Sequence, residues 1–122
     1  MKKVEAIIRP ERLQNVQDAL DELGVSGLTV TEVVGCGRQK GYTEQYRGAR
    51  ANISLLHKIK VEAVVPNDVV DAAVQAVVTG AYTGEVGDGR VFVIPIEESI
   101  RIRTGERGEE TVRHEIPAGW GH

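Results

Sequence analysis

The sequence predicts an α+β fold in which two βαβ units form one four-stranded antiparallel sheet with two helices. Three observations support this prediction: two segments have apolar residues at helical spacing, four segments are apolar and rich in β-branched residues, and each helical segment lies between two strand segments. This order of elements is the ferredoxin-like pattern. At 122 residues the chain has the length of one domain, and its composition of 41% hydrophobic and 27% charged residues is ordinary for a globular protein.

The first unit begins with residues 2–9, in which apolar and polar side chains alternate as in a strand. Pro10 then opens a helix, since proline is tolerated at an early helical position. The apolar side chains of this helix recur every three or four residues, and Gly24 is suited to end it. Residues 27–34 are predicted to form the second strand.

The second unit begins after a long polar segment, with residues 59–65 as the third strand. The helix that follows starts at a Pro-Asn-Asp sequence, with Asn67 or Asp68 as its predicted N-terminal cap. A glycine-rich loop leads to the fourth strand at residues 91–96, and residues 99–104 are predicted to be a short fifth strand.

Two helices can cover only one face of a four-stranded sheet. The segments 27–34 and 59–65 carry apolar residues at adjacent as well as alternate positions, which indicates that both faces are buried. We therefore expect a homo-oligomer in which sheets pack around a symmetry axis.

Composition excludes several classes of function. The net charge of −3 argues against a nucleic-acid-binding protein, which usually has a basic excess. No apolar run is long enough to span a membrane, and the N-terminus has no signal-peptide pattern. Cys36 is the single cysteine, so no disulfide can form within the chain and the cytoplasm is the expected compartment.

Two glycine-containing tetrapeptides are candidates for binding an anion. They are GDGR, from Gly87 to Arg90, and GCGR, from Gly35 to Arg38, each at the end of a predicted strand. Two glycines separated by one residue let the backbone approach an anion closely and direct N–H groups at it. The alternative interpretation of each is a tight turn, and the pattern alone does not decide between them.

Basic residues near the predicted strands are the second candidates. Arg101 and Arg103 are two residues apart, so on a strand they lie on one face, while Ile100 and Ile102 point into the core. Two guanidinium groups on one face suit a polyanion such as a triphosphate, although charges that keep an edge strand soluble would give the same pattern. Lys58 could be a ligand residue or an ordinary solvated lysine. Together these features indicate a small-molecule anion site, with a nucleotide as the favoured ligand.

Four motifs in a fixed order carry a family resemblance: KKVEAIIRPERL, GLTVTEVVGCGRQKGYTEQYRG, KIKVEAVVP and TGEVGDGRVFVIPIEESIRIRTGERG. From residue 1 to about residue 110 the chain resembles the PII signal-transduction proteins, which regulate nitrogen metabolism. The resemblance implies a homotrimer of ferredoxin-like domains spanning residues 1–112. It also implies that the polar segment at about residues 37–55 is the family's T-loop, and that residues 113–122 are a C-terminal tail.

The resemblance implies a site for ATP or ADP in each cleft between subunits. The residues that match the family's nucleotide-binding positions are Thr29, Gly35, Gly37, Arg38, Gln39, Val64, Gly87, Asp88, Gly89, Arg90, Arg101, Ile102 and Arg103.

The second implied ligand is 2-oxoglutarate, bound beside ATP and Mg²⁺. The matching residues are Gly37, Gln39, Lys40, Gly41 and Lys58, with Gln39 helping to hold the metal and Lys58 pairing with the distal carboxylate. Because the triphosphate and the oxoacid each supply oxygens to one hard cation, their binding is expected to be synergistic.

The T-loop is implied to bind partners such as ammonium transporters and enzymes of nitrogen metabolism, through Tyr46, Arg47 and Gly48. A membrane would then be reached only through a transporter, and no nucleic acid is expected as a partner. Ala49 and Ala51 occupy the positions that are phosphorylated or nucleotidylated in relatives, so we expect control by ligands alone. We expect no enzymatic activity; the alternative is a slow ATPase or phosphotransferase that uses the same site.

Overall fold

A computed structural model of the chain describes residues 1–25, 27–38 and 53–113. The strands and α-helices are, in chain order, β1 (Lys2–Ile8), α1 (Leu13–Glu22), β2 (Thr29–Arg38), β3 (Ile53–Val65), α2 (Val70–Ala81) and β4 (Arg90–Pro95). Three short 3-10 helices, η1 (Pro10–Arg12), η2 (Asn67–Val69) and η3 (Glu109–Val112), lie before α1, before α2 and near the C-terminus. The strands form one antiparallel sheet with the order β2-β3-β1-β4. The predicted ferredoxin-like fold is therefore confirmed.

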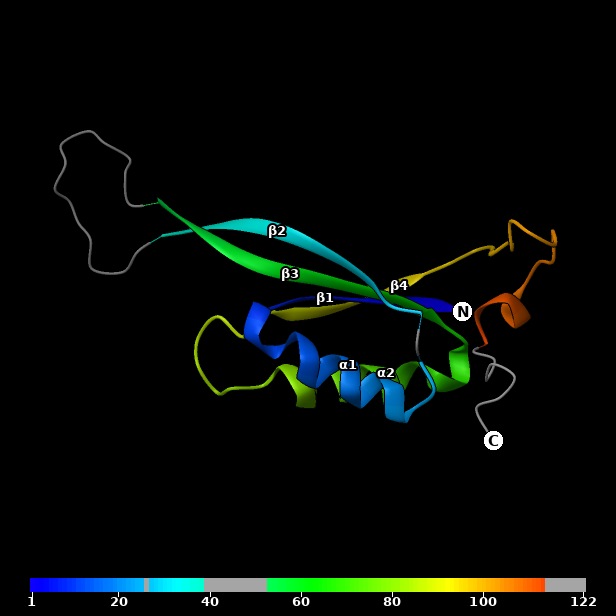
Figure 1. The fold of residues 1–122 in the computed structure, drawn as a ribbon, viewed down its shortest axis with the longest axis horizontal. Helices are drawn as coiled ribbons and strands as arrows, with labels where there is room; N and C mark the ends of the chain where they lie inside the picture. Colours follow the sequence, from blue (N-terminus) through cyan, green and yellow to red (C-terminus); the bar gives the residue numbers. More distant parts are fainter. Residues whose placement is uncertain (26, 39–52, 114–122) are drawn as a thin grey trace, which may run out of the picture.

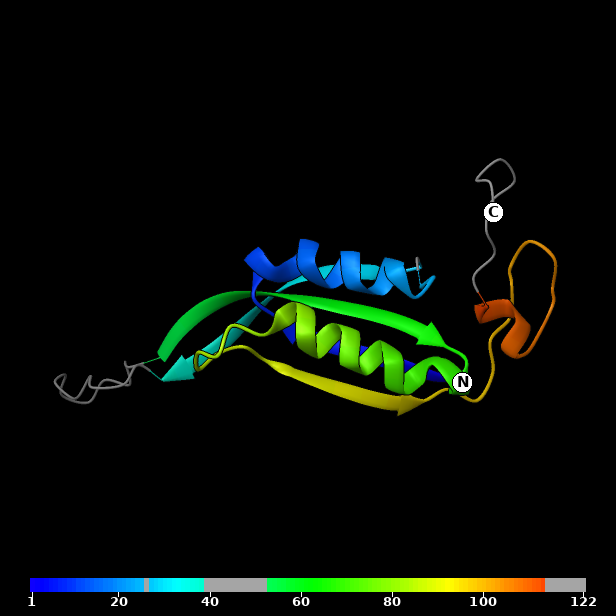
Figure 2. The same ribbon diagram turned by 90° about the horizontal axis from the view of Figure 1, so that it is seen from below.

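Both α-helices cover the same face of the sheet (Figures 1 and 2). The strands direct alternate side chains toward the helices, so that Val4, Ala6 and Ile8 of β1 are at most 3% exposed. The largest side chains of this core include Ile8, Leu20, Val16, Val25, Val61, Val65 and Val77. The opposite face carries residues such as Phe92, which is 44% exposed in the single protomer. The prediction of a homo-oligomer that covers this face stays a prediction.

Local sequence explains where the helices begin and end. Pro10 opens η1 and leads into α1, and Gly24 follows α1 with a φ of 81°, a conformation that favours glycine. The two helices approach each other at Gly80, where an added Cβ would lie 2.9 Å from the Cα atom of Val16. A larger residue at position 80 would therefore push the helices apart.

The hairpin of β2 and β3 is longer than the sequence predicted. Its ladder continues to a pair formed by Arg38 and Ile53, and the hairpin projects beyond the helices (Figure 1). The predicted T-loop limits of 37 and 55 are thus inside the strands. Two glycines and an arginine at the end of β2 concealed the pairing, since backbone hydrogen bonds do not depend on an apolar side chain.

The predicted fifth strand at residues 99–104 is wrong. The segment forms only an isolated bridge, between Ile100 and Arg107. The N–H of Gly105, which has a φ of 76°, donates to the carbonyl of Arg101 at 2.8 Å, and the chain turns back on itself. Ile100 and Ile102 do not enter the core as predicted, since Ile102 is fully exposed.

The predicted side-chain cap of the second helix is also absent. Neither Asn67 nor Asp68 makes a capping bond with its side chain. Instead the backbone N–H of Asn67 donates to Oε2 of Glu109 at 3.1 Å, so a carboxylate far along the chain takes this role. Among residues 1–25, 27–38 and 53–113, no helix has the length and apolar composition that crossing a membrane requires.

Candidate functional site

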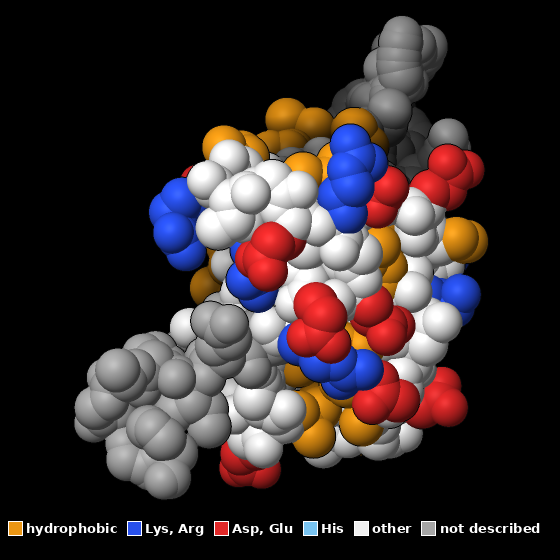
Figure 3. Space-filling model, turned by 90° about the vertical axis from the view of Figure 1, so that its right-hand side faces the viewer, with side chains coloured by type: hydrophobic (Ala, Val, Ile, Leu, Met, Phe, Trp, Pro, Cys, Tyr) orange, Lys and Arg blue, Asp and Glu red, His pale blue; other side chains and the backbone are white. Residues whose placement is uncertain are grey.

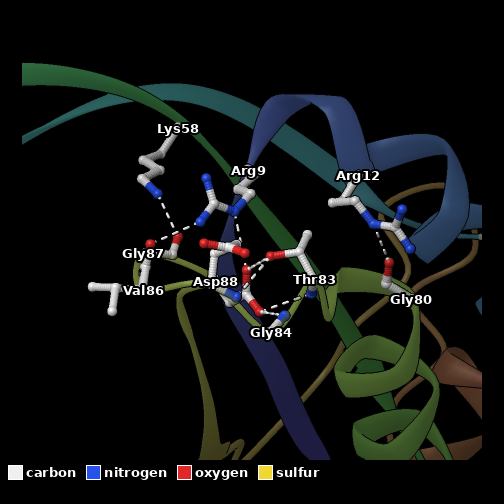
Figure 4. Close-up of polar contacts among 10 residues, drawn as sticks. Arg9, Arg12, Lys58, Gly80, Thr83, Gly84, Val86, Gly87 and Asp88 are labelled. Carbon is white, nitrogen blue, oxygen red and sulfur yellow. Dashed lines mark hydrogen bonds and ion pairs between the residues drawn. The ribbon is translucent and has the colours of Figure 1, made fainter.

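The loop of residues 82–89, between α2 and β4, is organised by the carboxylate of Asp88 (Figure 4). Its Oδ2 accepts hydrogen bonds from the backbone N–H groups of Thr83 at 2.8 Å and Gly84 at 2.9 Å. Its Oδ1 accepts from the Thr83 hydroxyl and from Nε of Arg9, the latter at 3.0 Å. The hydroxyl and amide of Thr83, followed by Arg9 and the Gly84 amide, hold the pKa of Asp88 well below its usual range.

Two glycines of this loop have backbone conformations that other residues rarely adopt. Gly87 and Gly89 both have a φ of 104°. A Cβ at Gly89 would lie 1.8 Å from the carbonyl oxygen of Ile7, so the loop backbone packs directly against β1. The turn itself therefore requires glycine at both positions of GDGR. An anion site at this loop is compatible with that requirement.

Two cationic side chains fasten the loop to the sheet (Figure 4). Nζ of Lys58, on β3, donates to the carbonyl of Gly87 at 2.7 Å, and Nη2 of Arg9 donates to the carbonyl of Val86 at 2.8 Å. Arg90 follows the loop as the first residue of β4 and is exposed. The structure therefore brings together five predicted site residues, here called the glycine-loop cluster: Lys58, Gly87, Asp88, Gly89 and Arg90.

Arg9 was missed by sequence reasoning. Its position, at the last residue of a predicted strand and before Pro10, was the available signal, because a strand end is where a side chain can reach a neighbouring loop. Its partners lie 77 and 79 residues along the chain, and no local pattern indicates them.

A second group of predicted residues lines a cavity of about 400 Å³, here called the Thr29 cavity. The lining residues are Lys3, Gly27, Thr29, Glu62, Ala63, Val64, Thr111, Val112 and Arg113. Nζ of Lys3 lies 2.9 Å from Glu62 and 3.2 Å from Glu5, and these contacts raise the pKa of Lys3. The same contact with Lys3 lowers the pKa of Glu62. The cavity thus joins Thr29 and Val64, both predicted to be near the nucleotide.

The predicted arginine pair does not have the strand geometry expected from its spacing. Nη1 of Arg101 lies 3.0 Å from Oε1 of Glu106, and its Nη2 donates to the carbonyl of Glu110 at 3.2 Å. Arg103 is exposed in the turn that replaces the predicted strand, together with Ile102. Arg101 therefore has an internal carboxylate as its counter-ion.

The glycine loop and residues 97–113, here called the C-terminal segment, lie at opposite ends of the sheet (Figure 1). β1 connects them, with Ile7 beside Gly89 at one end and Lys3 in the Thr29 cavity toward the other. One protomer therefore does not bring all the predicted nucleotide-binding residues into one site.

The remaining predicted residues belong to the β2–β3 hairpin or follow it. Gly35, Gly37 and Arg38 are in β2, where Gly35 pairs with Leu56. Residues that lie outside the described ranges are Gln39, Lys40, Gly41, Tyr46, Arg47, Gly48, Ala49 and Ala51. Within the part of the chain that is described, no three His, Cys, Asp or Glu side chains are grouped as metal ligands would be.

The fold and these contacts define a small ferredoxin-like protein with cationic side chains at both ends of its sheet. A family model described as Nitrogen regulatory protein P-II matches residues 1–106. The chain belongs to the P-II family of nitrogen regulatory proteins, as its sequence motifs predicted.

Individual relatives agree with this assignment. The Nitrogen regulatory protein P-II of Rhodobacter capsulatus is 55% identical over 112 residues, which are 92% of this chain and 100% of the relative. Nitrogen regulatory protein P-II 1 of Escherichia coli K12 is 51% identical over the same shares of the two chains. The crystal structure of Arabidopsis thaliana PII bound to citrate is 39% identical, has a TM-score of 0.75, and matches over 95% of this chain and 92% of that one. The Rhodobacter and Escherichia relatives are named as regulatory proteins.

Proposed function

We propose that this protein is a non-enzymatic, homotrimeric signal transducer that binds ATP or ADP and 2-oxoglutarate and regulates nitrogen-metabolism partners through its T-loop. The observation that carries the proposal is the separation of the predicted nucleotide-binding residues into two groups at opposite ends of one sheet (Figure 1). In a cyclic oligomer, neighbouring subunits meet through different surfaces, so opposite ends of two copies can form one site.

The chemistry of the two groups suits the two parts of a nucleotide. Val64 offers an apolar surface and Thr29 a hydroxyl in the Thr29 cavity, which suits a base and a ribose. Arg90, in the glycine-loop cluster, offers a guanidinium group for phosphate, and Arg101 offers another at the cavity's end of the sheet. The guanidinium groups proposed for the phosphates are thus divided between the two ends of the sheet.

Lys58 is the proposed partner of the distal carboxylate of 2-oxoglutarate. Its ammonium group already contacts the carbonyl of Gly87, a neutral acceptor, at 2.7 Å. A carboxylate would be a stronger acceptor for the same group. Mg²⁺, when bound, would join the triphosphate to the oxoacid, with Gln39 among its ligands. The citrate named in the Arabidopsis relative supports a carboxylate ligand here.

The contacts of Asp88 argue against the alternative of an ATPase or phosphotransferase. A residue that orients an attacking nucleophile needs a free acceptor oxygen. Both oxygens of Asp88 already accept hydrogen bonds, from Thr83, Gly84 and Arg9. Asp88 therefore has a structural role in this loop, and the regulatory function is the better supported one.

The proposed partners are ammonium transporters and metabolic enzymes, contacted in the cytoplasm through Tyr46, Arg47 and Gly48. Because Ala49 and Ala51 have no acceptor oxygen, ligand binding is the proposed means of control. The ligands contact the base of the T-loop and so shift its conformational equilibrium by differential binding.

Isothermal titration of 2-oxoglutarate, with and without Mg-ATP, tests this function. We expect binding only in the presence of Mg-ATP, and a roughly 10- to 100-fold loss of affinity in Lys58→Ala, the range for a hydrogen bond to a charged group. The control is Lys2→Ala, at the start of β1 and away from Lys58, and this variant should bind 2-oxoglutarate normally. Binding that ignores ATP, or that survives Lys58→Ala, would contradict the site assignment. A monomer in size-exclusion chromatography with light scattering would contradict the shared site.

A further inference from the structure

The C-terminal residues Glu109–Arg113 lie beyond residues 1–106, which the P-II family model matches. Within this segment, Thr111, Val112 and Arg113 form part of the lining of the Thr29 cavity, although sequence reasoning placed no site residue there. Residues 109–113 follow the loop that returns from Arg101, so their position depends on contacts with the rest of the protein.

Two side chains fasten the segment to the start of the second helix. Nη2 of Arg113 lies 3.2 Å from Oδ1 of Asp68 and 3.5 Å from Oε1 of Glu109. Oε2 of Glu109 accepts the backbone N–H of Asn67 at 3.1 Å. Figure 3 shows this end of the molecule, where acidic and basic side chains lie next to one another on the surface. These contacts, here called the Arg113 tie, therefore link residues 109–113 to residues 67–68 through an ion pair and a hydrogen bond from a backbone N–H.

Hydrogen bonds within the segment hold the cavity-lining residues relative to this tie. The hydroxyl oxygen of Thr111 lies 2.6 Å from both the Ser99 hydroxyl and the carbonyl of Gly108. The backbone N–H of Arg113 donates to the carbonyl of Glu110 at 3.3 Å. The turn between Glu110 and Arg113 therefore connects the Arg113 tie to Thr111 and Val112, and Thr111 is held in addition by Ser99 and Gly108.

We propose that Thr111 and Val112 are ligand-binding residues of the Thr29 cavity and that Arg113 is a positioning residue that holds them there. The proposal rests on the proposed nucleotide function, because Thr29 and Val64 on the other side of the cavity are the expected neighbours of the nucleotide. Val112 adds apolar surface beside Val64 in the cavity, so the segment shields one side of the bound base from water.

The expected effect is modest. The pair of Arg113 and Asp68 is exposed, and such pairs are worth up to about 1 kcal/mol, which is about fivefold in affinity. If Thr111 and Val112 are already held in place, no binding free energy is lost in ordering them. If they are released, they must be ordered when the ligand binds, and affinity falls. Cutting the tie should therefore weaken nucleotide binding by about two- to fivefold.

The test compares full-length Arg113→Ala, Asp68→Asn and the double variant with Arg107→Ala as a matched control. Arg107 belongs to the same C-terminal segment and pairs with Glu98 at 3.0 Å, but it does not line the cavity. The first readout is the ATP dissociation constant by titration calorimetry. The second, made without ligand, is amide hydrogen exchange of the peptide that contains Thr111 and Arg113.

We expect Arg113→Ala and Asp68→Asn each to weaken ATP binding about two- to fivefold and to speed exchange of these amides. The double variant should bind ATP about as tightly as the weaker of the two single variants, because both substitutions cut one tie. Arg107→Ala should change neither readout.

Two results would overturn the proposal while leaving the nucleotide function intact. In one, Arg113→Ala speeds exchange but ATP affinity is unchanged, so the segment is a structural element only. In the other, exchange is unchanged, so the tie does not hold the segment. A wild-type protein that binds no ATP would instead refute the proposed function itself, and this proposal with it.

Discussion

At the end of the sheet that carries the glycine loop, backbone groups and one carboxylate fix the loop, whereas at the opposite end exposed ion pairs hold the C-terminal segment. Asp88 accepts hydrogen bonds from two backbone N–H groups, and Gly89 packs against the backbone of β1. In the C-terminal segment, the pair of Arg107 and Glu98 is 65% and 46% exposed. Substitutions in the glycine loop should therefore lower the free energy of unfolding strongly. The ion pairs of the C-terminal segment can exchange partners at a small cost in free energy.

This difference suits a site shared between subunits. A rigid loop presents its amides and cations without reorganising, which preserves binding energy. The C-terminal segment can release Arg101 from Glu106 when a stronger anion arrives, because that pair is exposed and weak. A ligand that bridges the two ends would then order the looser one, and the comparison predicts unequal responses to substitution.

The largest effect is expected from Gly89→Ala. The φ of 104° and the backbone of Ile7, 1.8 Å from the added Cβ, together should cost about 2 kcal/mol or more of the free energy of unfolding. Gly105→Ala is the matched control: its φ is 76° but nothing lies within 4 Å of the added Cβ, so about 1 kcal/mol is expected. Denaturant unfolding of both variants measures the difference. Equal losses would mean that the loop is no more rigid than the C-terminal segment.

An intermediate effect, dependent on pH, is expected from Asp88→Asn. The folded-state pKa of Asp88 is lowered, chiefly by Thr83, so the ionised group stabilises the fold above the usual aspartate pKa of about 3.9. This contribution is lost as pH falls below that value and through the folded-state pKa. The thermal midpoint of the variant should therefore be lower than that of the wild type at pH 7, and the gap should narrow as the solution is acidified.

Thermal unfolding of both proteins from pH 7 to pH 2.5 provides the measurement, with Asp21→Asn on the exposed side of α1 as the control. Asp21→Asn should change the thermal midpoint little at pH 7, because Asp21 is exposed. A gap between wild type and Asp88→Asn that stays constant or widens in acid would show that the ionised carboxylate does not stabilise the loop.

The elements that the sequence predicted correctly are those whose information is local. The alternation in β1 and the helical spacing in α1 place Val4, Ile8, Val16 and Leu20 in the core, and each pattern is complete within a few residues. Gly24 and Pro10 mark the limits of the first helical segment in the same local way. The family assignment also followed from contiguous motifs.

The features that were missed depend on partners far along the chain. Ile100 and Ile102 alternate with arginines as in a strand, but an alternating segment forms a strand only beside a neighbour, and here the chain turns at Gly105. Glu109 satisfies the backbone at Asn67, 42 residues away, in place of a local cap. Likewise, the proposed shared site needs residues of two subunits, so the ligand-binding roles stay predictions.

The smallest effect is expected from Glu106→Gln. Glu106 is the internal counter-ion of Arg101, 3.0 Å away, and would compete with a phosphate for the guanidinium group. Because Glu106 is 56% exposed, removing its charge should tighten ATP binding only about two- to threefold. Glu98→Gln is the matched control, since it removes an equally close partner from Arg107 rather than Arg101. Competition between carboxylate and phosphate predicts tighter binding in Glu106→Gln alone; weaker binding in that variant would mean that Glu106 instead orients Arg101 toward the nucleotide, and that the C-terminal segment is as preorganised as the glycine loop.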